Sequence, residues 1–300
     1  MDSASRLPAA VPISASTPES EERLERLTQL CIDDVITAFG LGTVRHGRSV
    51  LESIVRTPAR RLARQVLTYD GIVGESGLGT GGAWALKRLV RNAGIEGQDN
   101  VPREGPLLLV SNHPGLADAV AVFSAAPRDD LRVIAADRPF LDALPNTSRY
   151  LLTVAEEPAG GSGVARAAAR HLRRGGAVLT FPGGRIEPDP AVLPGAVEAL
   201  GHWSSSAGLF ARLTPGLAVV PVVVSGVVSP SALRNPLTLL RRRKRDREWL
   251  AATLQMLIPA LRNVDARVEF GRPIYSESGG AVGETVIQET RRLMERREAK

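Results

Sequence analysis

The chain has 300 residues, of which 43% are hydrophobic and 23% charged, a composition typical of globular proteins. Its 38 basic and 32 acidic residues leave a formal charge of +6, and all but three of the basic residues are arginines. One cysteine excludes an internal disulfide framework and a cysteine-rich zinc site, four histidines leave little scope for a histidine-built metal centre, and 4% aromatic residues are few for a surface that stacks nucleic-acid bases.

The N-terminal third is predicted to be a disordered tail followed by helices. Residues 1–19 are rich in Ser, Ala and Pro, which is typical of disorder. Apolar residues then recur at helical spacing over 20–39 and again over 50–67. Arginines separate the apolar positions of the second helix, and Pro58 predicts a break or kink in it.

The glycine-rich stretch 71–82 predicts turns. It contains a G-x-G-x-x-G pattern from Gly77 to Gly82, which in dinucleotide-binding domains directly follows a strand. The residues before it have no strand pattern, so we favour a flexible linker, with a short basic helix over 83–91 after it. Residues 20–95 together are expected to form a helical arm.

From about residue 100, short apolar runs alternate with helical stretches, which is typical of an α/β sheet covered by helices. We therefore assign residues 96–300 to an α/β domain. The expected strands are 107–110, 131–135, 150–154, 177–181, 217–224 and 266–270. The expected helices are 116–126, 140–144, 164–174, most of 192–213, parts of 231–263, and 281 to the end.

The sharpest motif is Ser-Asn-His-Pro-Gly-Leu-Ala-Asp at 111–118, between the strand 107–110 and a helix. This placement presents His113 at the carboxyl end of a strand, where open α/β sheets bind ligands. Asp118 can fold back onto the imidazole, which fixes the tautomer and leaves the other ring nitrogen free as a base. A histidine bonded to a neighbouring helix cap is the alternative, and the strand–turn–helix context favours the His–Asp pair.

H-P-G-L-A-D resembles the H-x-x-x-x-D motif of the glycerolipid acyltransferase family, which includes the bacterial 1-acylglycerol-3-phosphate acyltransferases, and the preceding Ser111-Asn112 also resembles that motif. Other blocks follow in the family's order. Phe-Pro-Gly-Gly-Arg at 181–185 resembles F-P-E-G-[TG]-R, and Val-Pro-Val at 220–222 resembles a later block. Residues 137–145 match the second block loosely, so the resemblance spans roughly residues 100–230.

The resemblance implies a mixed central sheet flanked by helices, with an N-terminal helical arm. It also implies that His113 takes a proton from an acceptor hydroxyl, whose oxygen attacks the thioester of acyl-CoA or acyl-carrier protein, while Asp118 stabilises the imidazolium. No metal and no cofactor beyond this thioester co-substrate is expected. The resemblance implies that no acyl-enzyme is needed, and consistently the chain has no G-x-S-x-G nucleophile motif and Cys31 lies in a predicted core-facing helix.

The third block departs from the family because its glutamate is missing. Without a gap, Gly183 stands at the glutamate position, whereas a one-residue deletion keeps Gly184 and Arg185 in register with the family's G-R. We favour the deletion because it retains the arginine that the family associates with the acceptor's phosphate. Glu187 is a candidate for the lost carboxylate.

The second block lacks the family's G-x-x-F-x-x-R pattern, and Arg138 or Arg149 is a candidate for its arginine. These departures leave the acceptor open between a lysophospholipid resembling 1-acylglycerol-3-phosphate and a non-phosphorylated lipid. The resemblance implies substrate-binding roles for Asn112, Arg138, Pro182, Gly183, Gly184 and Arg185.

The positive charge is concentrated in two segments, 45–64 with six arginines and one glutamate, and 241–247 with six basic residues and one aspartate. Each segment fits a solvated helix face, a nucleic-acid patch or a contact with an anionic membrane. The neighbouring apolar residues and Trp249 favour the membrane, and we expect no nucleic-acid partner.

The chain shows no run of roughly 20 apolar residues and no signal-peptide pattern. The sequence therefore predicts a cytoplasmic acyltransferase of phospholipid biosynthesis, peripheral on the inner face of the cell membrane. A non-catalytic basic protein that binds membrane or nucleic acid is the competing class.

Overall fold

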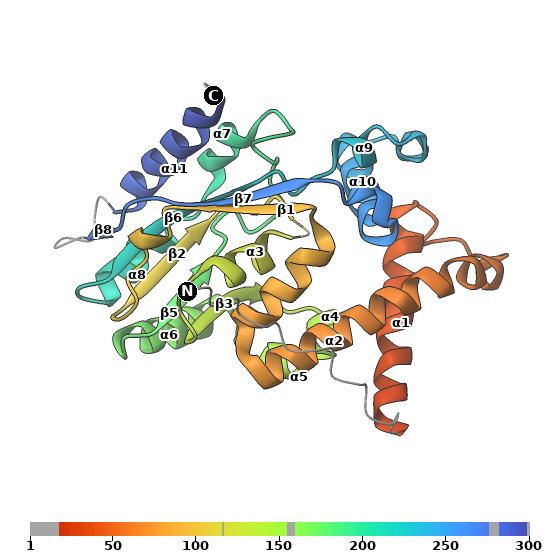
Figure 1. The fold of residues 1–300 in the computed structure, drawn as a ribbon, viewed down its shortest axis with the longest axis horizontal. Coiled ribbons are helices and arrows are strands. Elements are labelled where there is room, and N and C mark those ends of the chain that lie inside the picture. The colour runs from red at the N-terminus through yellow and green to blue at the C-terminus, as the bar shows by residue number, and fades with distance from the viewer. Residues whose placement is uncertain (1–17, 116, 155–159, 276–281, 299–300) are drawn as a thin grey trace, which may run out of the picture.

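A computed structural model of the chain describes residues 18–115, 117–154, 160–275 and 282–298. Nearly all of the predicted disordered tail, residues 1–17, lies outside this part, as does Leu116 of the His–Asp motif. The centre of the molecule is an eight-stranded sheet in the order β1-β7-β6-β2-β5-β3-β4, with β8 paired to β6 (Figure 1). The strands are β1 (Asn92–Glu96), β2 (Leu107–Ser111), β3 (Leu131–Ala136), β4 (Leu151–Val154), β5 (Ala177–Thr180), β6 (Ala218–Ser225), β7 (Asp265–Phe270) and β8 (Ile274–Tyr275).

The sheet is mixed. Strands β2, β3, β4, β5 and β6 run parallel, so their carboxyl ends meet at one edge, whereas β7 and β8 are antiparallel to β6. The prediction of a mixed α/β sheet is confirmed. Since the His–Asp motif follows β2 and the third block follows the adjacent β5, the topology places both at this carboxyl edge.

Helices cover both faces of the sheet and form the arm. The α-helices are α1 (Pro18–Ala38), α2 (Arg48–Leu89), α3 (Asp118–Ala125), α4 (Pro139–Asp142), α5 (Pro145–Ser148), α6 (Gly160–Arg173), α7 (Ala196–Ala199), α8 (Ser206–Leu213), α9 (Pro230–Leu233), α10 (Lys244–Leu257) and α11 (Val282–Glu298). Short 3-10 turns are η1 (Gln98–Asn100), η2 (Leu200–His202), η3 (Pro236–Leu240) and η4 (Pro259–Leu261).

The core has two layers because successive strand residues point to opposite faces. On β2, Leu107 and Leu109 pack with residues of α2 and α3, whereas Leu108 and Val110 pack with residues of α6, α8 and α11. Both faces of β2 and β6 are fully buried, as their unbroken apolar sequences predict. Burial of this kind fixes the central strands, and with them the loops at their carboxyl ends.

The glycine-rich stretch 71–82 is helical, so the predicted linker is wrong. It forms the second half of α2, with one break at Gly77, whose φ of 82° and ψ of 171° are not helical. A Cβ on Gly82 would lie 2.8 Å from the Val120 carbonyl oxygen and 2.9 Å from Phe123 Cβ of α3. Glycine is therefore needed at this position for close helix packing, and the helix continues through Pro58 without a second break.

The end of the predicted arm also differs. The boundary at residue 95 falls inside β1, an exposed edge strand that pairs in parallel with β7. All side chains of β1 are exposed, so the strand has no burial pattern that the sequence could reveal, and its pairing with β7 depends mainly on backbone hydrogen bonds. The part that stands away from the sheet is thus α1 with the first half of α2, against which α10 packs (Figure 1).

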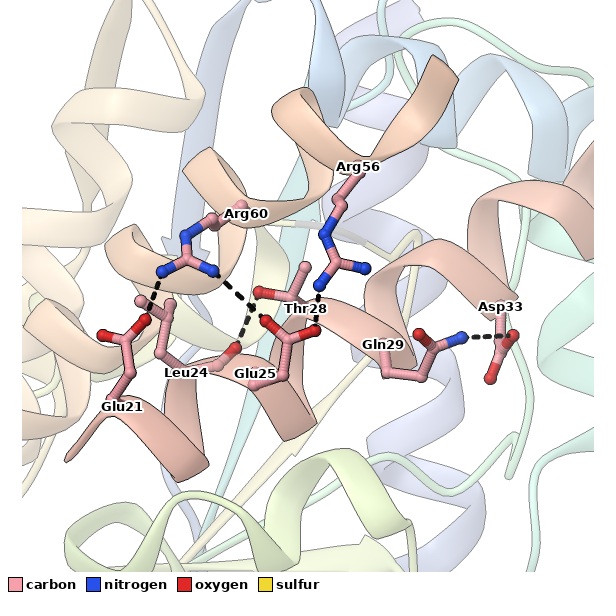
Figure 2. A network of polar contacts seen from close by, with 8 residues as sticks. All are labelled: Glu21, Leu24, Glu25, Thr28, Gln29, Asp33, Arg56 and Arg60. Atoms are coloured by element: carbon pink, nitrogen blue, oxygen red, sulfur yellow. Dashed lines mark hydrogen bonds and ion pairs between the residues drawn. The ribbon is translucent and has the colours of Figure 1, made fainter. Parts of the chain in front are cut away.

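The arm is held together by ion pairs across α1 and α2. Figure 2 shows Arg60 donating to Glu21 and Glu25, and Arg56 donating to Glu25. Arg48 likewise contacts Asp33, at 2.5 Å. Three of the six arginines of segment 45–64 therefore pair with α1, and this part of the predicted membrane patch is partly neutralised within the fold.

Among the described residues, no helix has the length and apolar character needed to cross a membrane.

Candidate active site

His113 and Asp118 form a hydrogen-bonded pair at the carboxyl end of β2. The Nδ1 of His113 lies 2.6 Å from Oδ2 of Asp118, and the Asp118 side chain is only 2% exposed. An ionised carboxylate can only accept, so Nδ1 carries the proton and Nε2 keeps its lone pair. The His113 side chain is 30% exposed, so the imidazole is not sealed inside the protein.

The turn between β2 and α3 is built to hold this carboxylate. Gly115 adopts φ 93°, a left-handed conformation that favours glycine, and its backbone N–H donates to Asp118 Oδ2 at 2.8 Å. The N–H of Ala119 donates to the other oxygen, Oδ1. Since Asp118 begins α3, the dipole of that helix also stabilises its negative charge. The five-residue spacing of the motif thus brings the imidazole of His113 and the backbone N–H groups of Gly115 and Ala119 around the carboxylate of Asp118.

The environment of His113 favours the charged form of its imidazole. Burial acts to lower the pKa of His113, but the hydrogen bond and charge of Asp118, together with the charge of Glu187, outweigh it. The net effect raises the pKa of His113 above its ordinary value. A base with a raised pKa takes a proton more readily and is stabilised once it has done so.

The third block lies directly beside this pair. The Phe181 ring packs against the His113 imidazole with 4.5 Å between ring centroids. Gly184, at φ 62°, turns the chain by donating its N–H to the Phe181 carbonyl, and the Pro182 carbonyl accepts the N–H of Ser204. The predicted substrate-binding residues Pro182, Gly183 and Gly184 therefore form the loop next to the base, although a substrate role for them stays a prediction.

Glu187 binds both backbone groups of His113, the N–H and the carbonyl. Its Oε2 accepts the His113 N–H at 2.9 Å, and its own N–H donates to the His113 carbonyl at 2.8 Å. Its Oε1 accepts the indole N–H of Trp203 at 2.7 Å. Burial raises the pKa of the Glu187 carboxyl, against the lowering effects of these two donors.

Asn112 ties β2 to β6. Its side-chain amide donates to the Val224 carbonyl at 2.9 Å, and its side-chain oxygen accepts the Val224 N–H at 2.8 Å. The residue is buried. The structure shows a role in joining two strand ends, and the predicted contact of Asn112 with substrate stays a prediction.

The candidate arginines lie in three different places. Arg185 is exposed on the third-block loop, near enough to Glu187 for its charge to lower the pKa of that carboxyl. Arg138 follows β3 and faces α1, where its charge lowers the pKa of Asp34 against the larger raising effects of burial and Asp33. Of these candidates, Arg185 is the one whose loop borders His113.

Arg149 is excluded from the site by the topology. It lines a cavity of about 310 Å³ together with Asp130, Arg132, Tyr150 and His171. Asp130 and Tyr150 directly precede β3 and β4, so this cavity opens at the amino ends of the strands, opposite to His113. Arg149 cannot replace the missing second-block arginine from there.

Sequence reasoning missed two residues that shape the site. Trp203 holds Glu187 in place, and the buried Asp189 accepts the backbone N–H groups of Gly226, Val227 and Val228 at 2.8 to 3.0 Å. Asp189 thereby fixes the loop after β6 to the loop after β5. Neither residue belongs to a sequence motif. The one signal that could have identified them is that they are polar side chains in a loop that are buried in the fold.

The lone cysteine is unsuited to act as a nucleophile. Cys31 is buried between α1 and α2, and burial together with the charge of Asp34 raises the pKa of its thiol to about 12. At neutral pH the thiolate, which is the reactive form, is essentially absent. This agrees with a direct transfer that uses no cysteine acyl-enzyme.

Comparison with known proteins tests the family that the motifs predict. Residues 92–225 match the Acyltransferase family model, a range that runs from the first residue of β1 to the last of β6. The chain carries an acyltransferase domain. This confirms the family predicted from the H-x-x-x-x-D motif and from the order of the later blocks, and the matched range holds His113, Asp118 and the third block.

Among solved structures, the chain is similar to the 1-acyl-sn-glycerophosphate acyltransferase PlsC from Thermotoga maritima. The two are 16% identical over 93% of this chain and 96% of that one, with a TM-score of 0.45. No curated protein matches the chain at a significant level.

Proposed function

We propose that this acyltransferase moves a fatty acyl chain from a thioester donor to the hydroxyl of a lysophospholipid resembling 1-acylglycerol-3-phosphate, as a step of phospholipid biosynthesis. The observation that carries the proposal is the His113–Asp118 pair, which leaves Nε2 unprotonated beside a partly open site. The H-x-x-x-x-D family resemblance supplies the substrate class.

The transfer needs one base and no covalent enzyme intermediate. Nε2 of His113 removes the proton from the acceptor hydroxyl as its oxygen attacks the thioester carbonyl carbon. The carbonyl π electrons move to the oxygen, and Asp118 stabilises the imidazolium that results. When the tetrahedral intermediate collapses, the C–S bond breaks and His113 returns the proton to the leaving thiolate, giving ester and free thiol.

The donor is proposed to be acyl-CoA or acyl-carrier protein, with no metal and no further cofactor. Release of free thiol measures turnover with either donor, and lipid mass spectrometry of an acceptor screen identifies the ester formed. We expect turnover with lysophosphatidic acid and its loss, roughly 10²- to 10⁴-fold, in His113→Ala. Full turnover in a folded His113→Ala protein would refute the mechanism.

We propose that Arg185 binds the phosphate of the acceptor. Its guanidinium is exposed on the loop that borders His113, and a planar guanidinium matches two phosphate oxygens. Arg185→Ala is expected to raise the KM for a phosphorylated acceptor about tenfold and to leave the donor KM unchanged. Arg174→Ala, at an exposed arginine beyond α6, is the matched control. An unchanged acceptor KM would favour a non-phosphorylated lipid, the second candidate acceptor.

We further propose that the enzyme meets this lipid on the inner face of the cell membrane. In η3, Leu239 and Leu240 are 69% and 63% exposed, and after the half-buried Arg241 come the exposed cations Arg242, Arg243 and Lys244. An apolar pair beside several cations suits an anionic lipid surface. Segment 45–64 offers a similar but weaker combination, since its exposed Val50 and Ile54 lie among arginines that partly pair with α1.

Sedimentation with vesicles separates these surfaces and the alternative partner. Leu239→Ser/Leu240→Ser is expected to reduce binding to vesicles of anionic phospholipid more than Val50→Ser/Ile54→Ser does. Binding should also fall with added salt, because the cations contribute. Binding to duplex DNA that exceeds binding to anionic vesicles at equal salt would support the competing nucleic-acid class instead.

A further inference from the structure

The third block lacks a glutamate, yet a carboxylate occupies the space next to it. Gly183 does not adopt a left-handed φ, so its backbone would accept a side chain. A Cβ built there lies 2.7 Å from Oε1 and 2.9 Å from Cδ of Glu187. The space that a side chain at 183 would enter is therefore filled by the carboxylate of Glu187.

That carboxylate is fully engaged at the base. Oε2 accepts the backbone N–H of His113, Oε1 accepts the indole N–H of Trp203, and Glu187 is buried. With the N–H of Glu187 on the His113 carbonyl, one residue binds both backbone polar groups of the base. The loops after β2 and β5 are joined at this point by backbone and side chain together.

The contact is suited to orienting the imidazole. His113 lies in the turn between β2 and α3, outside the hydrogen-bonded strand, so its main chain depends on loop contacts for its position. Its ring is placed by Asp118 on one side and Phe181 on the other, and its backbone by Glu187. Displacement of a catalytic group by about 1 Å costs roughly 10²-fold in rate.

We propose that Glu187 is a positioning residue for His113, and that it supplies from later in the chain the carboxylate that the third block lacks at position 183. The inference rests on the proposed role of His113 as the base. Glu187 in this position then requires glycine at 183, because any side chain at 183 would collide with the carboxylate.

The first test removes the carboxylate in two ways. Glu187→Ala is expected to lower kcat roughly 10²-fold and to leave the donor KM within about twofold. Glu187→Gln keeps the shape but loses the charge beside His113, so the acid limb of the pH profile of kcat/KM should move to lower pH. A wild-type kcat and an unmoved limb in Glu187→Gln would overturn the proposal.

The second test returns a carboxylate from position 183. An aspartate oxygen lies two bonds from its Cβ, which suits the 2.7 Å between the built Cβ and Oε1. Gly183→Asp/Glu187→Ala is expected to recover at least tenfold in kcat over Glu187→Ala, whereas Gly183→Asn/Glu187→Ala, equal in shape but uncharged, should recover less. Equal recovery by both would show that the space is merely filled, and would overturn the proposal.

A readout independent of turnover separates this proposal from the proposed function. The chain has four histidines, so the Cε1–H proton resonance of His113 is assigned by comparison with His113→Gln. Its titration should show a lower pKa in Glu187→Gln than in the wild type, and a value returned towards wild type in Gly183→Asp/Glu187→Ala. An inactive wild type with these shifts would refute the proposed function alone, and unchanged titration would refute the role of Glu187.

Discussion

Two regions of the molecule use carboxylates in contrasting ways. At the carboxyl edge of the sheet, Asp118, Glu187 and Asp189 are buried and accept backbone N–H groups. In the arm, Glu21 and Glu25 are exposed and pair with arginine side chains. A buried carboxylate bonded to the main chain fixes a loop in one geometry, whereas exposed pairs contribute little each and tolerate movement. The first arrangement fixes the loops around His113, and the second holds two helices together.

The largest effect should follow from Asp118→Asn. The amide can donate to Nδ1, which then loses its proton and shifts the imidazole to the wrong tautomer, so Nε2 no longer acts as a base. We expect kcat/KM to fall roughly 10²- to 10⁴-fold with the fold retained, as measured by thiol release and circular dichroism. Activity within tenfold of the wild type would mean that Asp118 does not set the tautomer.

Asp189→Ala should mainly reduce stability. Three backbone N–H groups of the loop after β6 would lose their acceptor, and two of the three belong to partly buried residues. Unpaired buried donors cost about 1–3 kcal/mol each, so we expect a loss of about 3 kcal/mol in urea denaturation. Asp129→Ala, at an exposed aspartate, is the control and should change stability by less than about 0.5 kcal/mol.

The pH dependence should report the raised pKa of His113. Only the neutral imidazole acts as base, so kcat/KM should fall as pH drops through a pKa above the ordinary value of about 6.5. The contribution of the charged His113, paired with Asp118, to the free energy of unfolding changes with pH in the opposite direction to kcat/KM. It is fully present below the unfolded pKa and is lost as pH rises through the folded one. An acid limb below 6.5 in the wild-type profile would contradict both statements.

The smallest effect is expected in the arm. Arg60→Ala removes pairs with Glu21 and Glu25 at a partly exposed site and should cost about 0–1 kcal/mol of unfolding free energy. The neighbouring Arg61 is exposed and forms no ion pair with the described residues of α1, so Arg61→Ala serves as the control. If Arg60→Ala lost as much unfolding free energy as Asp189→Ala, the contrast between the exposed pairs of the arm and the buried carboxylates of the sheet edge would be wrong.

The sequence predicted the parts of the fold that burial dictates. The apolar runs of β2, β5 and β6 are strands, and the motif after β2 places His113 and Asp118 together at the sheet edge. It did not predict β1, because an exposed edge strand held by backbone bonds leaves no apolar pattern. It also misread residues 71–82, where local glycine preference yields to packing against α3.

The remaining differences depend on contacts between residues far apart in the chain. Arg56 and Arg60 form a basic segment in sequence, but α1 brings acidic partners from more than 30 residues away. Glu187 likewise contacts His113 only because β2 and β5 lie side by side in the sheet, since 74 residues separate the two in the chain. The sequence marked Glu187 only as a candidate for the missing carboxylate, and neither its contact with His113 nor the arginine pairs could be predicted from spacing or composition.

The helical structure of α2, interrupted only at Gly77, has a consequence for the proposed contact with a lipid surface. This element runs for 42 residues from the arm to the sheet, and its second half packs on α3, the helix that begins with Asp118. A coil of glycines would let the arm and His113 move independently, whereas each of the two helical stretches of α2, before and after the kink at Gly77, rises a fixed 1.5 Å per residue. The element therefore joins the arm to the sheet as two rigid helical stretches, and under the proposed membrane contact the depth of the arm in a bilayer would set the height of His113 above the lipid headgroups.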